Sequence, residues 1–332
     1  MKEGASLQIK SLPEVVTGEY CVGCGACSYV SKCGMSLNKF GEYTPNIERL
    51  LQSDEVLIKK AELVCPSLNP AQNEDVLGAE LFGDGAVFND HLGFVQETYA
   101  GFALEDNYRK NGTSGGMVTW IAAELFKQGL IDGVIHVNEI NRENLEDPFF
   151  SYGVSRTLAE IKNGAKTRYH VIEISAVLES IKNTDDRFLF VGVPCFSKAV
   201  RRLQKVDKSL VKKIPFVVSL VCGHLKSVNW SLSLAWGAGV HPQTAKKIQY
   251  RTKGEGIPAR AYVYRVGDEN KDFVQKDSAN VVGGKFNVGA MMLPACDFCD
   301  DVVGETSDLT IGDAWIPRFD VDSEGTNLLI VR

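Results

Sequence analysis

The stretch RFLFVGV at residues 187–193 is followed by FSKAVRRLQKV at 196–206 and by IPFVVSLV at 214–221. The first and third segments are short apolar runs typical of buried strands, and the middle one has the apolar spacing of a helix. A strand, a helix and a second strand in this order form a βαβ unit whose strands lie parallel. The pattern therefore predicts an α/β protein with a mostly parallel sheet.

The same alternation continues toward both ends of the chain. Upstream, the sequence predicts a strand at ETYAGFAL, a helix at MVTWIAAELFKQGL, a strand at GVIHV and a helix near residues 175–181. Downstream, residues 246–286 contain KIQYRTK, ARAYVYRVG and KDFVQK, which alternate apolar and polar positions. This alternation is typical of half-buried strands, so we expect a β-rich antiparallel addition there.

The first 90 residues differ from the rest in pattern and in charge. They are rich in cysteine, glycine and asparagine, and only Ile47–Leu63 shows helical spacing. They hold 7 Lys and Arg against 13 Asp and Glu, which accounts for the whole net charge of −6. An acidic segment repels nucleic acid and anionic membrane and favours a basic protein surface as neighbour. We expect a separate module at 1–92 and an α/β domain at 93–332.

Cysteine content and hydropathy indicate the compartment. The chain has nine cysteines, an odd number, and its start, MKEGASLQIK, lacks the apolar core of a signal peptide. No apolar run reaches the roughly 18 residues that a membrane helix needs. The sequence thus predicts a cytoplasmic protein without membrane insertion, in which clustered thiols serve metal binding or redox chemistry rather than disulfide formation.

The first cysteine group is the run CVGCGAC, which places Cys21, Cys24 and Cys27 two residues apart. Glycines between the cysteines let the backbone approach a cluster and direct N–H groups at its sulfur atoms. Bacterial ferredoxins use this triplet with a remote cysteine, followed by proline, as fourth ligand, and Cys65-Pro66 fits that role. The rival is Cys33, which follows after five residues and precedes glycine. An iron–sulfur cluster is favoured over zinc, because zinc sites use two separated pairs.

The second cysteine group is scattered along the α/β domain. Cys195 and Cys222 each follow a predicted parallel strand, so their sulfur atoms would reach the same edge of the sheet, where α/β folds bind ligands. Cys296 and Cys299 form a C-x-x-C pair on a loop that could close over this edge. Four thiolates would make a second closed site. The alternatives are small buried side chains, a dithiol, or half of a zinc site.

Two polar segments are candidates for binding an anion. Thr113, Ser114, Gly115 and Gly116 lie in a glycine-rich loop before a predicted helix, an arrangement that suits the phosphate of a nucleotide or flavin. Its alternative is an ordinary loop with Ser114 as helix N-cap. The segment 166–170 offers two cations and a stacking ring, or else is a solvated turn. The cations and the ring belong to Lys166, Arg168 and Tyr169.

The most basic stretch of the chain follows Cys195. It is either a solvated helix face or a docking surface for an acidic electron carrier. Its members are Lys198, Arg201, Arg202, Lys205, Lys208, Lys212 and Lys213.

Six motifs, taken in order, resemble the family of coenzyme F420 hydrogenase/dehydrogenase beta subunits, which also contains 7-hydroxymethyl chlorophyll a reductase and ferredoxin-dependent divinyl chlorophyllide vinyl reductase. The resemblance runs from about Glu19 to the end of the chain. The motifs are CVGCGAC, TSGGMVTWIAAELFKQGLIDGVI, GAKTRY, VGVPCFSKAVRRL, SLVCGH and CDFCDDVVGETSDLTIGDAW.

The resemblance implies a ferredoxin-like iron–sulfur module followed by an FAD-binding domain with a second 4Fe-4S cluster on Cys195, Cys222, Cys296 and Cys299. It maps flavin contacts to Thr113–Gly116 and to Lys166, Arg168 and Tyr169. The implied function is an oxidoreductase that links a ferredoxin-like donor or reduced coenzyme F420 to a small-molecule acceptor. An electron-relay subunit and a zinc-stabilised binding module are the alternatives, and the pattern also allows a homo-oligomer. No residue is assigned as catalytic.

Overall fold

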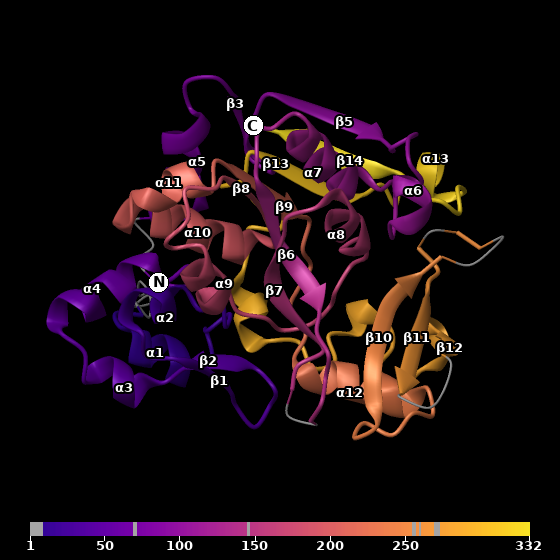
Figure 1. The fold of residues 1–332 in the computed structure, drawn as a ribbon, viewed down its shortest axis with the longest axis horizontal. Coiled ribbons are helices and arrows are strands. Elements are labelled where there is room, and N and C mark those ends of the chain that lie inside the picture. The colour runs from indigo at the N-terminus through magenta and orange to yellow at the C-terminus, as the bar shows by residue number, and fades with distance from the viewer. Residues whose placement is uncertain (1–8, 69–71, 145–146, 254–256, 259, 269–272) are drawn as a thin grey trace, which may run out of the picture.

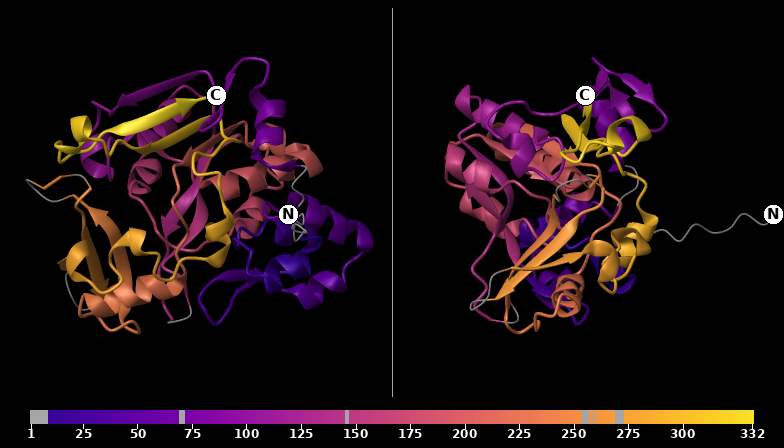
Figure 2. Two further views of the ribbon diagram at one scale, coloured as in Figure 1. Left: turned by 180° about the vertical axis from the view of Figure 1, so that it is seen from behind. Right: turned by 90° about the vertical axis from the view of Figure 1, so that its right-hand side faces the viewer.

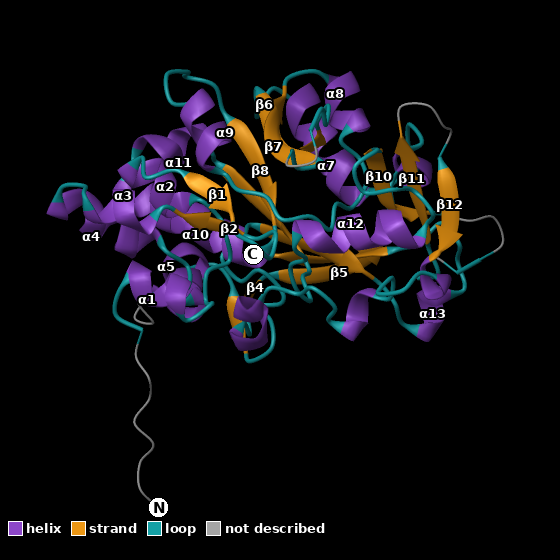
Figure 3. Ribbon diagram, turned by 90° about the horizontal axis from the view of Figure 1, so that it is seen from below, coloured by secondary structure: helices purple, strands orange, loops and turns teal. Residues whose placement is uncertain are grey.

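A computed structural model describes residues 9–68, 72–144, 147–253, 257–258, 260–268 and 273–332. The N-terminal segment and a three-stranded sheet lie at opposite ends of the molecule, with a seven-stranded sheet between and above them (Figure 1). Views from behind and from below show the same order (Figures 2 and 3). The first eight residues of the predicted 1–92 module lie outside the described residues.

The seven-stranded sheet has the order β5-β14-β13-β9-β8-β6-β7. Its four central strands, β13, β9, β8 and β6, are parallel, and antiparallel strands complete both edges. The mixed α/β fold with a large parallel core is thus confirmed. The strands are β5 (Glu97–Gly101), β6 (Gly133–Glu139), β7 (Phe150–Ser155), β8 (Phe188–Gly192), β9 (Phe216–Leu220), β13 (Leu309–Asp313) and β14 (Asn327–Val331).

Both faces of this sheet are covered, as the continuous apolar strands require. Leu189 and Val218 pack on one face with α7, whereas Phe188, Phe190 and Val217 pack on the other with α9 and α10. Successive strand residues point to opposite faces, so both sets become buried. The helices of this region are α6 (Tyr108–Asn111), α7 (Met117–Lys127), α8 (Leu158–Asn163), α9 (Ser175–Ser180), α10 (Pro194–Val206) and α11 (Ser209–Lys213).

The predicted β-rich addition is present as an antiparallel sheet in the order β10-β11-β12. Helix α12 contacts β10, and Trp230 of the helix stacks on Tyr250 of the strand at 5.6 Å between ring centroids. The remaining elements of the second half are β10 (Ala245–Thr252), β11 (Val263–Asp268), β12 (Val274–Asp277), α12 (Val228–Gly237), α13 (Pro317–Asp320), η2 (Ser278–Asn280), η3 (Phe286–Val288) and η4 (Pro294–Phe298).

The N-terminal segment consists of short helices and two hairpins. The helical spacing at Ile47–Leu63 corresponds to two helices, α3 and α4, because Asp54 accepts a hydrogen bond from the Val56 N–H at 2.7 Å and starts a new helix. The elements are α1 (Leu12–Thr17), α2 (Ala26–Ser31), β1 (Met35–Leu37), β2 (Tyr43–Pro45), α3 (Ile47–Leu51), α4 (Glu55–Val64), α5 (Glu74–Phe82), β3 (Val87–Asn89) and β4 (Gly93–Val95). The domain boundary near residue 92 stays a prediction.

The basic stretch is used mainly inside the molecule, which corrects both expectations for it, a solvated helix face and a docking surface. Helix α10 packs against α2 and α4, and Lys198 Nζ binds Glu74 at 2.6 Å. Lys205 binds Glu80 at 2.5 Å, and Arg201 binds Asp308 at 2.9 Å. The acidic N-terminal segment therefore finds its basic neighbour within the same chain.

Three lysines of that stretch are exposed: Lys205, which is paired with Glu80, and Lys208 and Lys212. In the described parts of the chain, no helix combines the length and the apolar character that crossing a bilayer requires.

Candidate functional site

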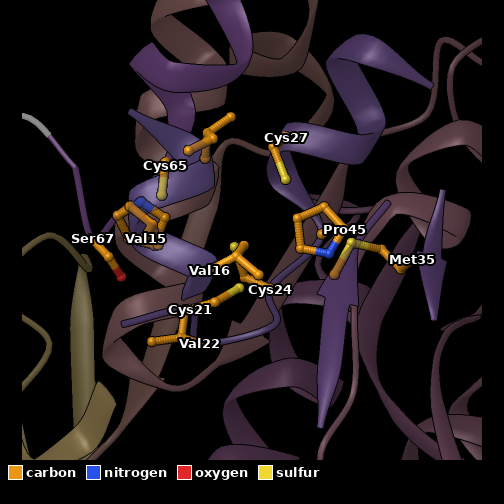
Figure 4. Close-up of a pocket in the computed structure, with 13 residues that line it drawn as sticks. Val15, Val16, Cys21, Val22, Cys24, Cys27, Met35, Pro45, Cys65 and Ser67 are labelled. Carbon is orange, nitrogen blue, oxygen red and sulfur yellow. The ribbon is translucent and has the colours of Figure 1, made fainter. Parts of the chain in front are cut away.

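The first cysteine group surrounds one pocket. Cys21 and Cys24 lie on the loop before α2, Cys27 lies in α2, and Cys65 directly follows α4. All four line a small pocket that apolar residues of α1 close from another side (Figure 4). Cys24, Cys27 and Cys65 are buried. The structure thus brings together the four residues predicted to hold the first cluster.

Two glycines give the loop its shape. Gly23 has φ +69°, and a Cβ there would lie 2.8 Å from the Tyr43 carbonyl oxygen. Gly25 has φ +83°, and a Cβ there would lie 2.5 Å from Oε2 of Glu173. The Gly23 N–H also donates to Cys21 Sγ at 3.4 Å. Only glycine fits these positions, since both need a left-handed conformation and close approach.

Cys33 occupies a different place. It is buried and its thiol contacts that of Cys27, but it is not found among the described residues that line the pocket. Ser31 links the two, since its hydroxyl donates to the Cys27 carbonyl oxygen and accepts from the Cys33 N–H. This placement favours Cys65 over Cys33 as the fourth ligand, a role that stays a prediction.

The second cysteine group gathers at the carboxyl edge of the parallel strands. Cys195 lies in the first turn of α10 after β8, and Cys222 follows the neighbouring β9. Cys296 and Cys299 come from η4 and the residue after it, and both lie near Cys195 and Cys222. The Leu225 N–H donates to Cys296 Sγ at 3.2 Å. Three separate segments therefore meet at the sheet edge that was predicted from the two parallel strands.

The two cysteine groups lie next to each other. Burial raises the pKa of Cys195, and Cys222 and then Cys24 raise it further. Cys24 of the first group therefore lies near Cys195 of the second. Tyr152 of β7 lies near both cysteines, and its hydroxyl donates to the Val191 carbonyl oxygen at 3.2 Å. No sequence pattern predicts this proximity, because Cys24 lies on a loop of the N-terminal segment and Cys195 lies at the carboxyl edge of the parallel strands.

The buried thiols of both groups need a positively charged partner in order to become thiolates. Burial raises the pKa of Cys21 and of Cys222 to about 12, and that of Cys299 to about 11. A thiolate is therefore costly at these positions unless a metal compensates its charge. Positive charge is already gathered nearby: Arg202 donates to the carbonyl oxygens of Cys65 and of Leu68.

Each group offers four cysteine thiols, which is the ligand number of a 4Fe-4S cluster. Within the ranges that the structure describes, no three His, Cys, Asp or Glu side chains converge closely enough to hold one metal ion. A zinc site needs its ligands at about 2.3 Å from one atom. In a 4Fe-4S cluster each of the four cysteines binds a different iron atom. The residues present fit such a cluster at each group.

The glycine-rich loop 113–116 connects α6 to α7. Gly116, with φ +77°, is the N-cap of α7, so the alternative with Ser114 as N-cap is wrong. The Ser114 hydroxyl instead donates to the Thr326 carbonyl oxygen at 3.0 Å. Asn327 of β14 accepts from the Met117 N–H at 3.1 Å and lies where a Cβ on Gly115 would clash. Strand β14 thus fixes the loop against the sheet.

The structure joins this loop to the second predicted anion-binding segment. The hydroxyls of Thr113 and Thr167 lie 2.8 Å apart. Next to them, burial and then Arg168 and Arg265 lower the pKa of Lys166. Arg168 itself lies 3.5 Å from Glu139, whereas no ion pair is found for Lys166 among the described residues. An excess of positive charge at a buried position suits a phosphate group.

Two further cations on β10 and just after it, missed in the sequence, complete this region. Arg251 binds Asp313 at 2.6 Å, donates to the Thr113 carbonyl oxygen at 3.4 Å, and contacts Tyr169. Lys253 Nζ donates to the Ser114 carbonyl oxygen at 2.9 Å. The segment KIQYRTK shows both residues, but only the fold brings the end of β10 to the glycine-rich loop.

Comparison with known proteins identifies the family. Residues 98–179 match the N-terminal region, and residues 185–332 the C-terminal region, of the family described as coenzyme F420 hydrogenase/dehydrogenase, beta subunit. The chain belongs to this family. Membership supports an oxidoreductase role with electron transfer, and the matched ranges contain the second cysteine group and every predicted flavin contact. The first cysteine group lies before both ranges.

Two relatives of this beta-subunit family resemble nearly the whole chain. One of the subunits of F(420)H(2) dehydrogenase from Methanosarcina mazei is 23% identical over 326 residues, which cover 97% of this chain and 81% of the relative. Coenzyme F420-dependent sulfite reductase of Methanocaldococcus jannaschii is 22% identical over 335 residues, 97% of this chain but only 45% of the relative. The chain therefore spans less than half of that second protein.

A solved structure supports the same fold for this beta-subunit family member. A chain of the F420-reducing [NiFe] hydrogenase complex from Methanosarcina barkeri superimposes with a TM-score of 0.54 and 20% identity. The match covers 74% of this chain and 78% of the other.

Proposed function

We propose that this protein is an iron–sulfur flavoprotein oxidoreductase with two 4Fe-4S clusters and FAD. It would pass electrons between a ferredoxin-like one-electron donor, or reduced coenzyme F420, and an organic two-electron acceptor. Family membership supports the oxidoreductase class, and the names of the two relatives support coenzyme F420 as a reactant. The clusters, when bound, carry single electrons, and FAD exchanges them in pairs with an organic molecule.

The observation that carries the proposal is the continuity of the three candidate sites. The first cysteine group adjoins the second through Cys24 and Cys195. From the second group, His224 stacks on Phe286 at 4.0 Å, and Phe286 lies 4.4 Å from Tyr169, ring centroid to ring centroid. Tyr169 reaches the glycine-rich loop through Arg251. Electron transfer needs such close succession of centres.

The residues of the flavin region would bind and orient rather than react. Lys166, Arg168 and Lys253 would neutralise the pyrophosphate of FAD, and the loop would hold it at the start of α7. Tyr169 offers a ring against which a flat group can stack. Asp313 holds Arg251 at 2.6 Å and so keeps this cation pointed at the loop.

One measurement tests the composition of the proposed protein. Protein purified without oxygen should show flavin and cluster absorbance, with about eight iron atoms, eight sulfides and one FAD per chain. Zinc without iron or sulfide would instead support a zinc-stabilised binding or assembly module. Colourless protein from such a preparation would overturn the oxidoreductase proposal.

A second candidate is an electron-relay subunit without a substrate of its own. It is favoured by the similarity to one chain of a hydrogenase complex and to a subunit of a dehydrogenase. The isolated chain is then expected to take up electrons from reduced coenzyme F420 but to reduce no organic acceptor. Turnover of an acceptor by the isolated chain, with reduced coenzyme F420, ferredoxin or a reduced dye as donor, would contradict it.

A further inference from the structure

Lys226 is a buried cation beside the second cysteine group. The residue is 1% exposed. Its backbone forms an isolated antiparallel β-bridge with Met292, which lies four residues before Cys296 in the chain. Its Nζ donates to the Ala290 carbonyl oxygen at 2.8 Å. The same atom lies 5.1 Å from the ring centroid of Phe286 and 5.4 Å from that of Trp230. The ammonium group is therefore held in a fixed place.

The surroundings of Lys226 do not balance its charge. Aromatic ring faces and one carbonyl oxygen attract an ammonium group, but no carboxylate of the described residues forms an ion pair with it. Burying a charge without an opposite partner is costly. The negative group nearest to hand is Cys296: the backbone N–H of Leu225, the residue before Lys226, donates to Cys296 Sγ at 3.2 Å, which places Lys226 beside this thiol.

Cations near the first cysteine group are different. Lys198 is paired with Glu74 at 2.6 Å, and Arg202 is bound by backbone carbonyl oxygens of residues 65, 68 and 72. Each of these side chains has a structural partner that accounts for its position. Lys226 has one backbone carbonyl oxygen as its partner and, among the described residues, no ion pair, so its charge is available to a negative group at Cys296.

We propose that Lys226 balances the negative charge of the second cysteine group and raises the reduction potential of the cluster bound there. This inference rests on the proposed function, since it requires a cluster on Cys195, Cys222, Cys296 and Cys299. Four thiolates give such a cluster a net negative charge, and reduction adds one electron to it. A nearby ammonium group stabilises the reduced state more than the oxidised state.

The location gives Lys226 a specific role in the direction of electron flow. It lies on the side of the second group where Phe286 leads to Tyr169 and the flavin region. A higher potential at this cluster favours electron transfer to it from the first cluster. Lys226 acts on the cluster only through its positive charge and takes no part in forming or breaking bonds.

The test is an anaerobic redox titration with dithionite, followed by electron paramagnetic resonance. Lys226→Gln keeps a hydrogen-bond donor but removes the charge, Lys226→Arg keeps the charge, and Lys208→Met is a control at an exposed lysine. We expect the midpoint potential of one cluster to move to more negative values in Lys226→Gln, with iron content unchanged. The wild-type potential should be retained in Lys226→Arg and in Lys208→Met.

The outcomes separate this inference from the proposed function. If the wild type holds two clusters and their midpoint potentials are unchanged in Lys226→Gln, the role proposed for Lys226 is overturned and the proposed function stands. Iron for only one cluster in the wild type would overturn the proposed function, and this inference with it. If Lys226→Gln does not fold, Lys226→Met provides the uncharged variant, with an unbranched apolar side chain that suits the aromatic surroundings.

Discussion

The two cysteine groups are built in opposite ways. In the first, three cysteines come from one seven-residue run and the fourth follows a helix that packs on the same module. In the second, Cys195, Cys222 and the pair at 296 and 299 come from three segments that meet only at the edge of the sheet. The first group is mostly buried, whereas Cys299 of the second is exposed. A local motif can thus be enclosed by its own module, while an assembled site depends on the whole domain.

The largest expected effect tests the membership of the first group. Cys65→Ser should lose about half of the bound iron, because one of two clusters would lack a ligand. The matched control is Cys33→Ser, which should keep the full iron content, since Cys33 contacts Cys27 but does not line the pocket. Iron and sulfide analysis after anaerobic purification measures both. The reverse result would exchange the roles of the two cysteines.

The next effect tests whether the shape of the first loop depends on its contacts with the α/β domain. Gly25→Ala should lower the free energy of unfolding by about 2–4 kcal/mol, because a left-handed residue is strained and its Cβ meets Glu173. Gly34→Ala is the control: its φ is +87°, but no atom lies within 4 Å of a Cβ there. We expect it to cost only about 1 kcal/mol. Thermal unfolding of both variants and of the wild type measures the two losses of stability. Equal losses in the two variants would mean that the contact with Glu173 is unimportant.

A smaller effect concerns the flavin region beside the second group. Lys253→Met should weaken FAD binding about tenfold, roughly 1.4 kcal/mol, because one cation near the glycine-rich loop is lost. Fluorescence titration of flavin-depleted protein measures the Kd, and Lys208→Met is the exposed control. An unchanged Kd for Lys253→Met would remove Lys253 from the proposed phosphate site.

The smallest effect concerns acidic side chains where the N-terminal segment meets the loop of the second group. Burial, Asp301, Asp75 and Glu74 raise the pKa of Glu305 to about 7, from a usual 4.5. The folded state therefore holds this proton more tightly than the unfolded state, and the stabilisation present below pH 4.5 is lost as the pH rises through 7.

Replacing this carboxyl should flatten the pH profile. Glu305→Gln should gain stability relative to wild type between pH 5 and pH 8, by less than about 1 kcal/mol, since the group is half exposed and screened by water. The difference between the Tm values of the two proteins, measured across this range, should grow with pH. A constant difference would show that Glu305 keeps its usual pKa in the folded protein.

What the sequence could predict depended on how local the pattern was. The run at Cys21–Cys27 and the strands around 188–192 and 216–220 are each decided within a few residues, and the structure has them as expected. The shared edge of Cys195 and Cys222 also followed, because parallel neighbours end on the same side.

Long-range contacts explain what the sequence could not provide. The proximity of Cys24 to Cys195, the hydrogen bond from Lys253 to Ser114 and the ion pair of Lys198 with Glu74 each join segments far apart in the chain. Helical spacing made the basic residues of α10 look like a solvated face or a docking surface. Only the packing of the acidic segment against this helix shows their partners.

The position of β14 has a consequence for the order of folding. This strand lies between β5 and β13, and among the described strands β5 pairs with β14 alone. During synthesis, β5 must therefore wait until residues 327–331 have left the ribosome, and pairing over such a separation is slow. Asn327 also fixes the loop at Gly115 and the start of α7. The proposed flavin region should consequently form only after residues 327–331 have been synthesised.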